Sequence, residues 1–343
     1  MRPSTLISMG LSGRAWLLLS LRRLSRPFYR LFFLASASEN GILRLLADGP
    51  VSLDRIAIAL GVDAQGREAL DGWLGVGCAL GELGKTSQGY GLRGYLARRL
   101  AMAENDDVAA YFEVIGFTHS RVLRDGIERL RKGEQFTFDE FDPVMVARGS
   151  RIAAPFVQEV LDQIIPTRGP FHLLEVGCGS AVYLRHTTTH NPDLTALGID
   201  LDEAVVDLAR ERVCAWGIGD RARIELGDIL DVPPRPEYDL VTLHNGIYYF
   251  PVADRVPLLE HLRGFVRPGG RILLTTNCRG CGTAMIEVLS YLMSATRGCG
   301  PLPTPAEMLD QMEKAGVTTR PPIRPMAQEP FHAFVGTVEP SGE

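Results

Sequence analysis

From Phe171 onward, short runs of apolar residues alternate with segments whose apolar positions recur at helical spacing. This alternation is typical of a parallel sheet covered by helices. The predicted strands are His172–Val176, Thr195–Ile199, Arg223–Leu226, Tyr238–Leu243, Arg271–Thr275, Val317–Ile323 and Phe331–Val338. The predicted helices are Tyr183–His190, Glu203–Trp216, Asp254–Val266, Ala284–Arg297 and Pro305–Ala315. We therefore expect an α/β fold over the second half of the chain.

The first hundred residues have a helical pattern instead. Apolar residues from Phe28 to Leu46 recur close to helical spacing, and Pro27 suits the first turn of such a helix. Ser52 is a candidate N-cap for a second helix, and a third helix is expected over about 63–83. Residues 84–92 then favour two short strands around a turn. Three helices followed by a small hairpin are the pattern of a winged-helix-like domain.

These patterns predict a winged-helix-like domain at residues 1–103, and then a helical linker or cap and the α/β core within residues 104–343, the core starting at about 171. The third helix of the first domain carries four acids and one basic residue: Asp63, Glu68, Asp71, Glu82 and Arg67. DNA recognition needs cations facing phosphates and bases, and the net charge of the chain is −5. We therefore expect this helix to pack against protein, and we expect no nucleic-acid partner.

The apolar segment Trp16–Leu21 is short, and Arg22 follows it at once. A membrane-spanning helix needs roughly 20 apolar residues, and no cleavage site for a signal peptide clearly follows. We expect a helix that lies on a surface or packs on a partner, without membrane insertion. The chain has six cysteines, and no disulfide framework is expected at this size, which favours the cytoplasm.

Two cysteines, in Cys278-Arg-Gly-Cys281, have the spacing of a metal-ligand pair. A four-ligand site would need a second pair of cysteines or histidines, and none accompanies this one. We therefore expect no metal.

A loop of small residues, Glu175-Val-Gly177-Cys-Gly179-Ser-Ala181, follows the first predicted strand and opens a helix. Small residues let a ligand approach the backbone closely. A dinucleotide loop requires a third glycine three positions after Gly179, where this chain has Val182. Glu175 would repel a pyrophosphate but would suit a cationic, amine-bearing ligand. The loop therefore indicates a nucleoside-type ligand that carries an amine.

Acids also stand at the ends of the next two predicted strands. Asp200 lies 25 residues after Glu175, where it can accept hydrogen bonds from both hydroxyls of a ribose. Asp228 ends the third strand in a position to bind an adenine amino group. Each acid alone could simply cap the following helix or turn. Three acids at successive strand ends favour a ligand site, because ligands of open α/β sheets bind there.

Residues 171–343 resemble the class I S-adenosylmethionine-dependent methyltransferases, which have a Rossmann-like seven-stranded core. The matching segments are Leu-Leu-Glu-Val-Gly-Cys-Gly-Ser-Ala at 173–181, Ala-Leu-Gly-Ile-Asp at 196–200, Gly-Asp-Ile at 227–229, Tyr-Asp-Leu-Val-Thr-Leu-His at 238–244 and Val-Arg-Pro-Gly-Gly-Arg-Ile-Leu-Leu at 266–274. The chain departs from many relatives at Ala181, where they carry a third glycine.

The resemblance implies that S-adenosyl-L-methionine is the cofactor. It places Glu175, Gly177 and Gly179 around the methionine portion. Asp200 would hold the ribose and Leu201 would pack on the adenine, with Asp228 and the neighbouring Ile229 at the adenine's amino edge.

The helical first domain is similar in pattern to that of small-molecule O-methyltransferases of secondary metabolism. In that group the N-terminal domain forms a dimer and helps to wall the substrate pocket. The resemblance therefore implies a homodimer that methylates a small-molecule acceptor.

The segment after the fourth predicted strand, residues 243–251, would face the transferable methyl group. The O-methyltransferases place a His-Asp pair here with the histidine as general base, and this chain has His244-Asn245. An unperturbed imidazole suits that task, but His244 could instead be a packed residue that shapes the pocket. Tyr248 and Tyr249 could line an acceptor pocket, with Asn245 beside them, or belong to the core.

The sequence alone is compatible with several functions. Transfer to nitrogen or carbon instead of oxygen is possible, since Asn245-Gly-Ile-Tyr248 loosely resembles a segment of amino-group methylases. A cofactor-sensing DNA-binding regulator is disfavoured by the acidic third helix. A non-methylating enzyme on the same fold is compatible with the missing acid beside His244.

Overall fold

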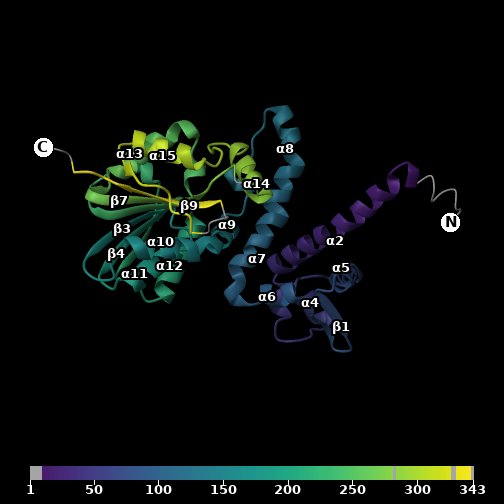
Figure 1. Ribbon diagram of the computed structural model, residues 1–343. Helices are drawn as coiled ribbons and strands as arrows, with labels where there is room; N and C mark the ends of the chain where they lie inside the picture. Colours follow the sequence, from purple (N-terminus) through teal and green to yellow (C-terminus); the bar gives the residue numbers. More distant parts are fainter. Residues whose placement is uncertain (1–9, 281–282, 326–329, 341–343) are drawn as a thin grey trace. The chain divides into compact units, whose positions relative to one another are not determined.

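The computed structural model describes residues 10–280, 283–325 and 330–340. The chain divides into two compact units, the first ending at Thr118 and the second beginning at His119 (Figure 1). This division lies fifteen residues after the predicted boundary at 103, inside a π-helical turn, Val114–His119. The segment after residue 103 belongs with the first unit because α7 (Asp106–Glu113) packs against the first long helix.

The first unit contains helices and one antiparallel hairpin. Its elements are α2 (Arg14–Glu39), α3 (Ile42–Leu45), α4 (Leu53–Ala59), α5 (Arg67–Leu80), β1 (Leu83–Thr86), β2 (Gly89–Leu92), α6 (Tyr95–Leu100) and α7. Ser52 caps α4, since its Oγ accepts a hydrogen bond from the N–H of Arg55 at 3.4 Å. β1 pairs with β2 as expected, and Leu34, Leu43 and Leu74 lie in the buried core.

The prediction that Pro27 stands in the first turn of a helix is wrong. α2 begins at Arg14, and Pro27 lies inside it. A proline there removes the hydrogen bond to the carbonyl of Arg23. Arg23 is exposed, so water can bind that carbonyl instead. The helix continues because the part after the proline is anchored by buried Phe33 and Leu34.

The second unit is built on a seven-stranded sheet. Its strands are β3 (Phe171–Val176), β4 (Leu194–Asp200), β5 (Ala222–Leu226), β6 (Tyr238–His244), β7 (Val266–Asn277), β8 (Thr318–Thr319) and β9 (Phe331–Thr337). Their order is β5-β4-β3-β6-β7-β9-β8, with β3 to β7 parallel and β9 antiparallel to both of its neighbours. The α/β fold class with seven strands is therefore confirmed.

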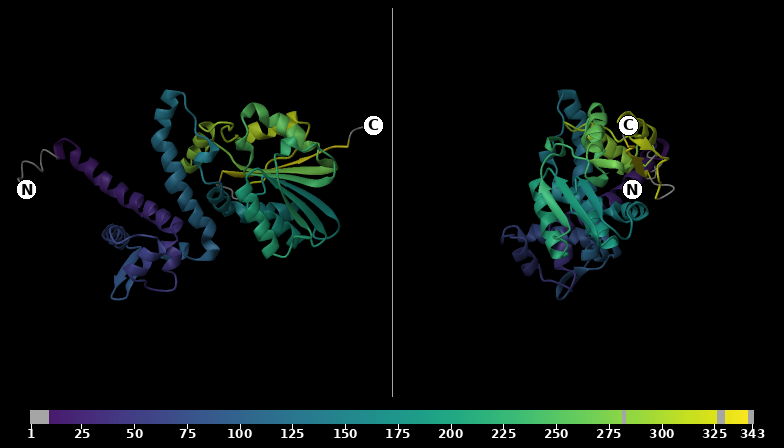
Figure 2. Two further views of the ribbon diagram at one scale, coloured as in Figure 1. Left: turned by 180° about the vertical axis from the view of Figure 1, so that it is seen from behind. Right: turned by 90° about the vertical axis from the view of Figure 1, so that its left-hand side faces the viewer.

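Helices cover both faces of the sheet. The helices of the second unit are α8 (Ser120–Lys132), α9 (Pro143–Gly149), α10 (Ala154–Ile164), α11 (Val182–His190), α12 (Glu203–Ala215), α13 (Arg255–Arg263), α14 (Ala284–Ser294) and α15 (Pro305–Lys314). α10, α11 and α12 lie on one face and α13 and α15 on the other, as Figure 2 also shows from behind. Side chains alternate along each strand, so Leu173 packs with the first layer and Leu174 with the second.

Several of the predicted boundaries differ from those in the structure. The strand expected at 317–323 shrinks to Thr318–Thr319 and a single bridge at Ile323, because Pro321 and Pro322 have no N–H to donate to the sheet. The helix expected to reach Val266 ends at Arg263, and Val266 begins β7. Both changes lie outside the strand ends that carry the candidate site.

The carboxyl ends of four parallel strands meet along one edge. Val176 of β3 is in register with Ile199 of β4 and with Leu243 of β6, and His244 is in register with Thr275 of β7. This register brings the glycine loop, Asp200 and the His244 segment to the same edge. The second unit also contains Phe138–Glu140, a short 3₁₀ turn between α8 and α9.

Candidate active site

The glycine loop turns the chain from β3 into α11 through three left-handed residues. Gly177 has φ 65°, Gly179 has φ 53° and Ala181 has φ 57°. The N–H groups of Gly177 and Cys178 both donate to the carbonyl of Ile199, at 2.8 and 3.1 Å, which fixes the loop on β4. A Cβ added to either glycine would meet nothing within 4 Å. The two glycines therefore leave open space above the loop, into which a ligand can come close to the backbone.

Ala181 occupies the third of these left-handed positions. A non-glycine residue pays roughly 1–2 kcal/mol for this conformation. The side chain is fully buried, so its methyl group recovers part of that cost through packing. Alanine is thus accommodated at this left-handed position, and it does not close the space above the loop.

Glu175 is a buried acid at the end of β3, only 1% exposed. Neither carboxylate oxygen has a hydrogen-bond partner among the described residues. Burial raises the pKa of Glu175 well above its usual value, and the nearby Asp200 raises it further. A buried carboxyl without a partner is costly. A ligand that brings a cation or several N–H donors would satisfy both oxygens, so the α-ammonium group of S-adenosylmethionine fits this position.

Asp200, at the end of β4, is bound by the glycine loop. Its Oδ2 accepts a hydrogen bond from the N–H of Gly179 at 2.9 Å, and its Oδ1 accepts a longer one from Asp202 at 3.3 Å. Burial raises its pKa. Asp202, and not Asp200, caps α12 by accepting from Val205. Asp200 therefore does not cap a helix. Leu201 beside it is 66% exposed, so its side chain could contact an apolar surface of a ligand.

Asp228 has a local structural task. Its Oδ1 accepts a hydrogen bond from the N–H of Leu230 at 2.9 Å and so caps a short turn. The side chain of Ile229 is buried, and its carbonyl lies 2.8 Å from Nε2 of His261. Capping occupies one of the two carboxylate oxygens of Asp228. For that oxygen, capping the turn is a sufficient explanation, and no ligand is needed.

His244 is buried at the end of β6. Its Nδ1 lies 2.9 Å from Oγ1 of Thr275, and its ring packs against Tyr183 with centroids 4.5 Å apart. Nε2 is buried and has no partner among the described residues. Burial lowers the pKa of His244 to about 3, so the imidazole is neutral at neutral pH.

The next residues turn sharply away from the sheet. Asn245 has a left-handed φ of 50°, and its N–H donates to the carbonyl of Thr275 at 2.7 Å. Its Oδ1 is buried without a partner. A short 3₁₀ turn, Ile247–Tyr249, follows, with the rings of Tyr248 and Tyr249 4.9 Å apart. Tyr248 is buried in the core, whereas Tyr249 is partly exposed.

Thr275, Tyr183 and Phe138 lie near these groups and were not singled out from the sequence. Thr275 sits on β7, and its contact with His244 depends on the strand register. Tyr183 opens α11 directly after the glycine loop, so its proximity could have been read from the loop motif. Phe138 lies more than one hundred residues before Tyr249, and its ring centroid is 5.6 Å from that of Tyr249.

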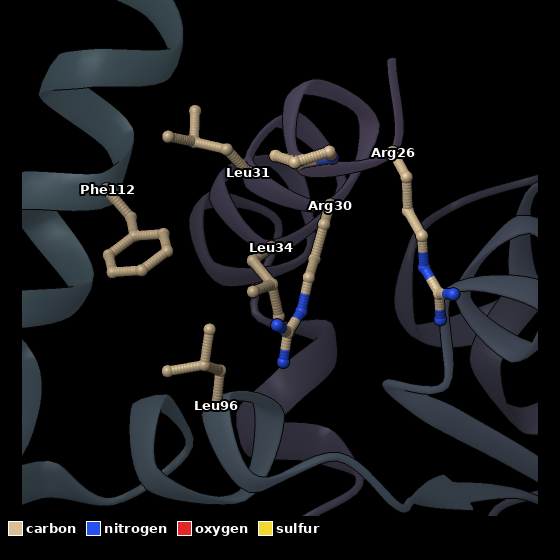
Figure 3. Close-up of a pocket in the computed structure, with 7 residues that line it drawn as sticks. Arg26, Arg30, Leu31, Leu34, Leu96 and Phe112 are labelled. Atoms are coloured by element: carbon tan, nitrogen blue, oxygen red, sulfur yellow. The ribbon is translucent and has the colours of Figure 1, made fainter. Parts of the chain in front are cut away.

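A cavity of about 320 Å³ lies in the first unit, between α2, α6 and α7 (Figure 3). It is lined by Arg26, Pro27, Arg30, Leu31, Leu34, Leu96 and Phe112. Arg30 is paired with the buried Glu82, and Arg26 donates to the carbonyl of Leu80. None of the predicted site residues lines this cavity.

Comparison with known proteins shows which class of protein resembles the region that contains the strand-end site. A family model described as a methyltransferase domain matches residues 174–272. This part of the chain is therefore similar to a methyltransferase domain. The matched range begins in β3 and runs to β7, and thus includes Glu175, Asp200 and His244. The resemblance to the S-adenosylmethionine-dependent methyltransferases is confirmed, and S-adenosylmethionine is the cofactor of this class.

One curated relative of the methyltransferase domain is the 27-O-demethylrifamycin SV methyltransferase of Amycolatopsis mediterranei. It is 30% identical over 112 residues, which are 32% of this chain and 40% of the relative. The demethylmenaquinone methyltransferase of Symbiobacterium thermophilum is 31% identical over 104 residues, 30% of this chain and 41% of that protein. The chain thus spans less than half the length of each of these two relatives.

Solved structures match over almost the whole chain. The mitomycin 7-O-methyltransferase has a TM-score of 0.76 at 18% identity, covering 95% of this chain and 99% of that one. Human N-acetylserotonin methyltransferase in complex with S-adenosylmethionine has a TM-score of 0.71 at 18% identity, covering 95% and 98%. At this level of identity the likeness shows the fold, a methyltransferase core with a helical N-terminal region.

Among the described residues, no helix combines the length and apolar character that crossing a membrane requires. Cys281 of the Cys278-Arg-Gly-Cys281 segment lies outside the described residues.

Proposed function

We propose that the chain transfers the methyl group of S-adenosylmethionine to a hydroxyl oxygen of a small molecule. The observation that carries the proposal is the buried carboxyl of Glu175. Its two oxygens have no hydrogen-bond partner within the described part of the chain, and they lie beside an open glycine loop and Asp200. The cofactor, when bound, supplies an activated methyl group on a sulfonium. The O-methyltransferases among the structural neighbours support oxygen as the atom that accepts it.

The residues of the site have distinct tasks in this proposal. Glu175 binds the ammonium group of the cofactor. Gly177 and Gly179 have no side chains, so the cofactor can come close to the backbone of the loop. Asp200 accepts hydrogen bonds from the ribose hydroxyls, which form charge-assisted bonds stronger than neutral ones. The adenine is held by the exposed side chain of Leu201, by Asp228 and by Ile229. This arrangement fixes the methyl group near the end of β6.

His244 is the proposed proton acceptor for the hydroxyl group. A neutral imidazole can take a proton, and its contact with Thr275 occupies Nδ1 and leaves Nε2. Which nitrogen carries the proton depends on whether Thr275 donates or accepts in that contact. The pKa near 3 makes the imidazole a weak base. If so weak a base contributes nothing, His244 is a packed residue that shapes the pocket.

The experiment is a transfer assay with methyl-labelled S-adenosylmethionine and a panel of phenols, alcohols, amines and activated carbon acids. We expect label in a phenol or alcohol product, together with one equivalent of S-adenosylhomocysteine. Asp200→Ala serves as the control that loses cofactor. Label only in amines or carbon acids would replace the oxygen acceptor by nitrogen or carbon. Cofactor that binds but is never demethylated would count against methyl transfer.

We also propose that the chain forms a homodimer through its first unit. The α2 helix exposes a row of large apolar side chains, Trp16, Leu17, Leu21 and Leu24 among them. Exposed apolar surface of this extent marks an interaction site. Light scattering coupled to gel filtration should give twice the chain mass, and Leu17→Glu with Leu21→Glu should reduce it to one chain mass with an unchanged circular dichroism spectrum. A wild-type monomer at micromolar concentration would contradict the proposal.

A further inference from the structure

Phe138 lies on a short turn beside the aromatic residues that follow β6. Its side chain is 50% exposed, although its ring centroid is only 5.6 Å from that of Tyr249. Tyr249 in turn lies 4.9 Å from Tyr248, which is buried in the core. The three rings thus run from the core outwards, and the outermost one keeps an open face.

The turn that carries Phe138 is held rigidly. Thr137 and Glu140 form a reciprocal capping box, in which the N–H of Thr137 donates to Oε1 of Glu140 at 3.1 Å. Arg121 and Arg129 of α8 donate to Oε2 of Glu140 at 2.5 and 2.6 Å. Two guanidinium groups therefore clamp one carboxylate, and such charge-assisted bonds are strong and directional.

The same turn is also fixed at its start. Phe136 is buried, and Arg129 stacks over its ring at 4.1 Å. The N–H of Phe136 donates to the carbonyl of Ala295, and the carbonyl of Phe136 accepts from the N–H of Arg297, both at 2.9 Å. A loop this firmly attached to α8 and to the segment after α14 gives Phe138 a defined position, whereas a single exposed apolar residue on a free loop would need no explanation.

Tyr249, which the open ring of Phe138 contacts, lies close to the candidate cofactor site. Tyr249 is four residues beyond Asn245, which ends the left-handed turn after His244. Asp200 is one of the groups that raise the pKa of Tyr249, after burial and Cys299, so the phenol lies within electrostatic reach of the acid assigned to the ribose. An acceptor that rests on Tyr249 and Phe138 would therefore be held beside the bound methyl donor.

We propose that Phe138 and Tyr249 form an aromatic wall that selects acceptors carrying a flat ring, and that Glu140 is the positioning residue that holds this wall in place. The inference rests on the proposed methyl transfer, because it names the class of acceptor for the same site. Offset or edge-on contacts between rings favour flat aromatic ligands over saturated ones of the same size.

The test compares two probes of one skeleton, 2-naphthol and 2-decalol, which differ in that only the first is flat and aromatic. Binding is measured by ligand-observed NMR in the presence of S-adenosylhomocysteine. We expect the wild type to prefer 2-naphthol at least fivefold, Phe138→Ala to bind it about tenfold more weakly and Phe138→Leu to lose the preference between the probes. Cofactor affinity should be unchanged in both variants.

Glu140→Gln tests the clamp, with Glu128→Gln as the matched control. Glu128 lies on the same helix α8 and pairs with Lys132 at the exposed surface. We expect Glu140→Gln to weaken 2-naphthol binding severalfold without changing cofactor affinity, and Glu128→Gln to change neither. Glu140→Asp, which keeps the charge, should recover part of the loss.

These measurements do not depend on turnover, so the two proposals can fail separately. Preference for 2-naphthol that requires Phe138 supports the wall even if no methyl group is transferred. No binding of 2-naphthol to the wild type, equal binding of both probes, or an unchanged Phe138→Ala would overturn it. Transfer of label to a saturated alcohol at the same rate in wild type and Phe138→Ala would overturn the wall and leave the methyl transfer standing.

Discussion

At the carboxyl ends of the strands in the second unit, one half of the edge carries acids and the other half carries neutral polar groups. At β3 and β4, Glu175 and Asp200 bring two acids close together, and burial raises the pKa of both. At β6 and β7, His244 and Thr275 form a buried neutral pair, and burial lowers the pKa of the imidazole to about 3. Burial disfavours charge in both halves. In the acidic half, Glu175 has no hydrogen-bond partner among the residues that the structure describes. In the neutral half, Nδ1 of His244 has Thr275 as its partner, and this half suits a neutral acceptor.

The largest effect is expected for Asp200→Ala in the acidic half. It removes two charge-assisted hydrogen bonds of roughly 1.5–3 kcal/mol each, so cofactor affinity should fall by at least about 100-fold. Titration calorimetry with S-adenosylhomocysteine measures it. Asp202→Ala is the matched control: it removes the cap of α12 and should cost about 1 kcal/mol of stability but leave affinity unchanged. Unchanged affinity in Asp200→Ala would remove Asp200 from the site.

In the neutral half, His244→Ala should leave cofactor affinity nearly intact. If His244 removes the proton, turnover should fall roughly 100-fold. The readout is the initial rate across pH at saturating cofactor. Thr275→Ser keeps the hydroxyl beside Nδ1 and should retain most of the rate, whereas Thr275→Val should not. Full turnover in His244→Ala would show that His244 does not remove the proton and only shapes the pocket.

Glu175→Gln tests the role of charge in the acidic half, because glutamine has nearly the same shape as glutamate but cannot be ionised. Cofactor affinity at pH 7.5 should fall about tenfold, because a charged partner of the ammonium is lost. The free protein should instead become more stable at neutral and higher pH. A carboxyl whose pKa is raised on folding stabilises the fold below its unfolded pKa of about 4.3, and that contribution is lost as pH rises through the folded pKa. Thermal melts of both proteins between pH 5 and 9 should therefore diverge as pH rises.

The smallest effect is expected for Ala181→Gly in the loop between β3 and α11. Relief of the left-handed strain is worth roughly 1–2 kcal/mol, but a buried methyl group of about 0.8 kcal/mol is lost and glycine adds about 0.5–1 kcal/mol of chain flexibility. The free energy of unfolding in urea should change by less than about 1 kcal/mol, with cofactor affinity unchanged. A larger loss of stability would mean that the methyl packing outweighs the strain.

The acidic half was largely predictable from the sequence because its signals are local. Gly177, Gly179 and Asp200 stand at fixed spacings from apolar strands, and that spacing alone brings them to one edge. The sequence could not show that both oxygens of Glu175 lack a partner among the described residues, since this depends on the surrounding packing. The capping role of Asp228 is local, and the sequence left it open beside the role in binding. The start of α2 was missed because buried Phe33 and Leu34 hold a helix together across Pro27.

The neutral half was harder to predict because its contacts are long-range. Thr275 meets His244 only through the register of β6 and β7, and Phe138 reaches Tyr249 across more than one hundred residues. The sequence identified the imidazole and the missing acid beside it. It could not show that a threonine from the neighbouring strand takes the place next to Nδ1.

The position of β9 between β7 and β8 has a consequence for how the chain is made. Until Phe331–Thr337 leaves the ribosome, β7 has an open edge, and β8 has no strand to pair with. An open, apolar edge is a site for pairing with other chains. The edge of β7 is therefore covered only once β9 has been made. Chains that stop before Phe331 should be prone to aggregation, although their strand-end residues are already complete.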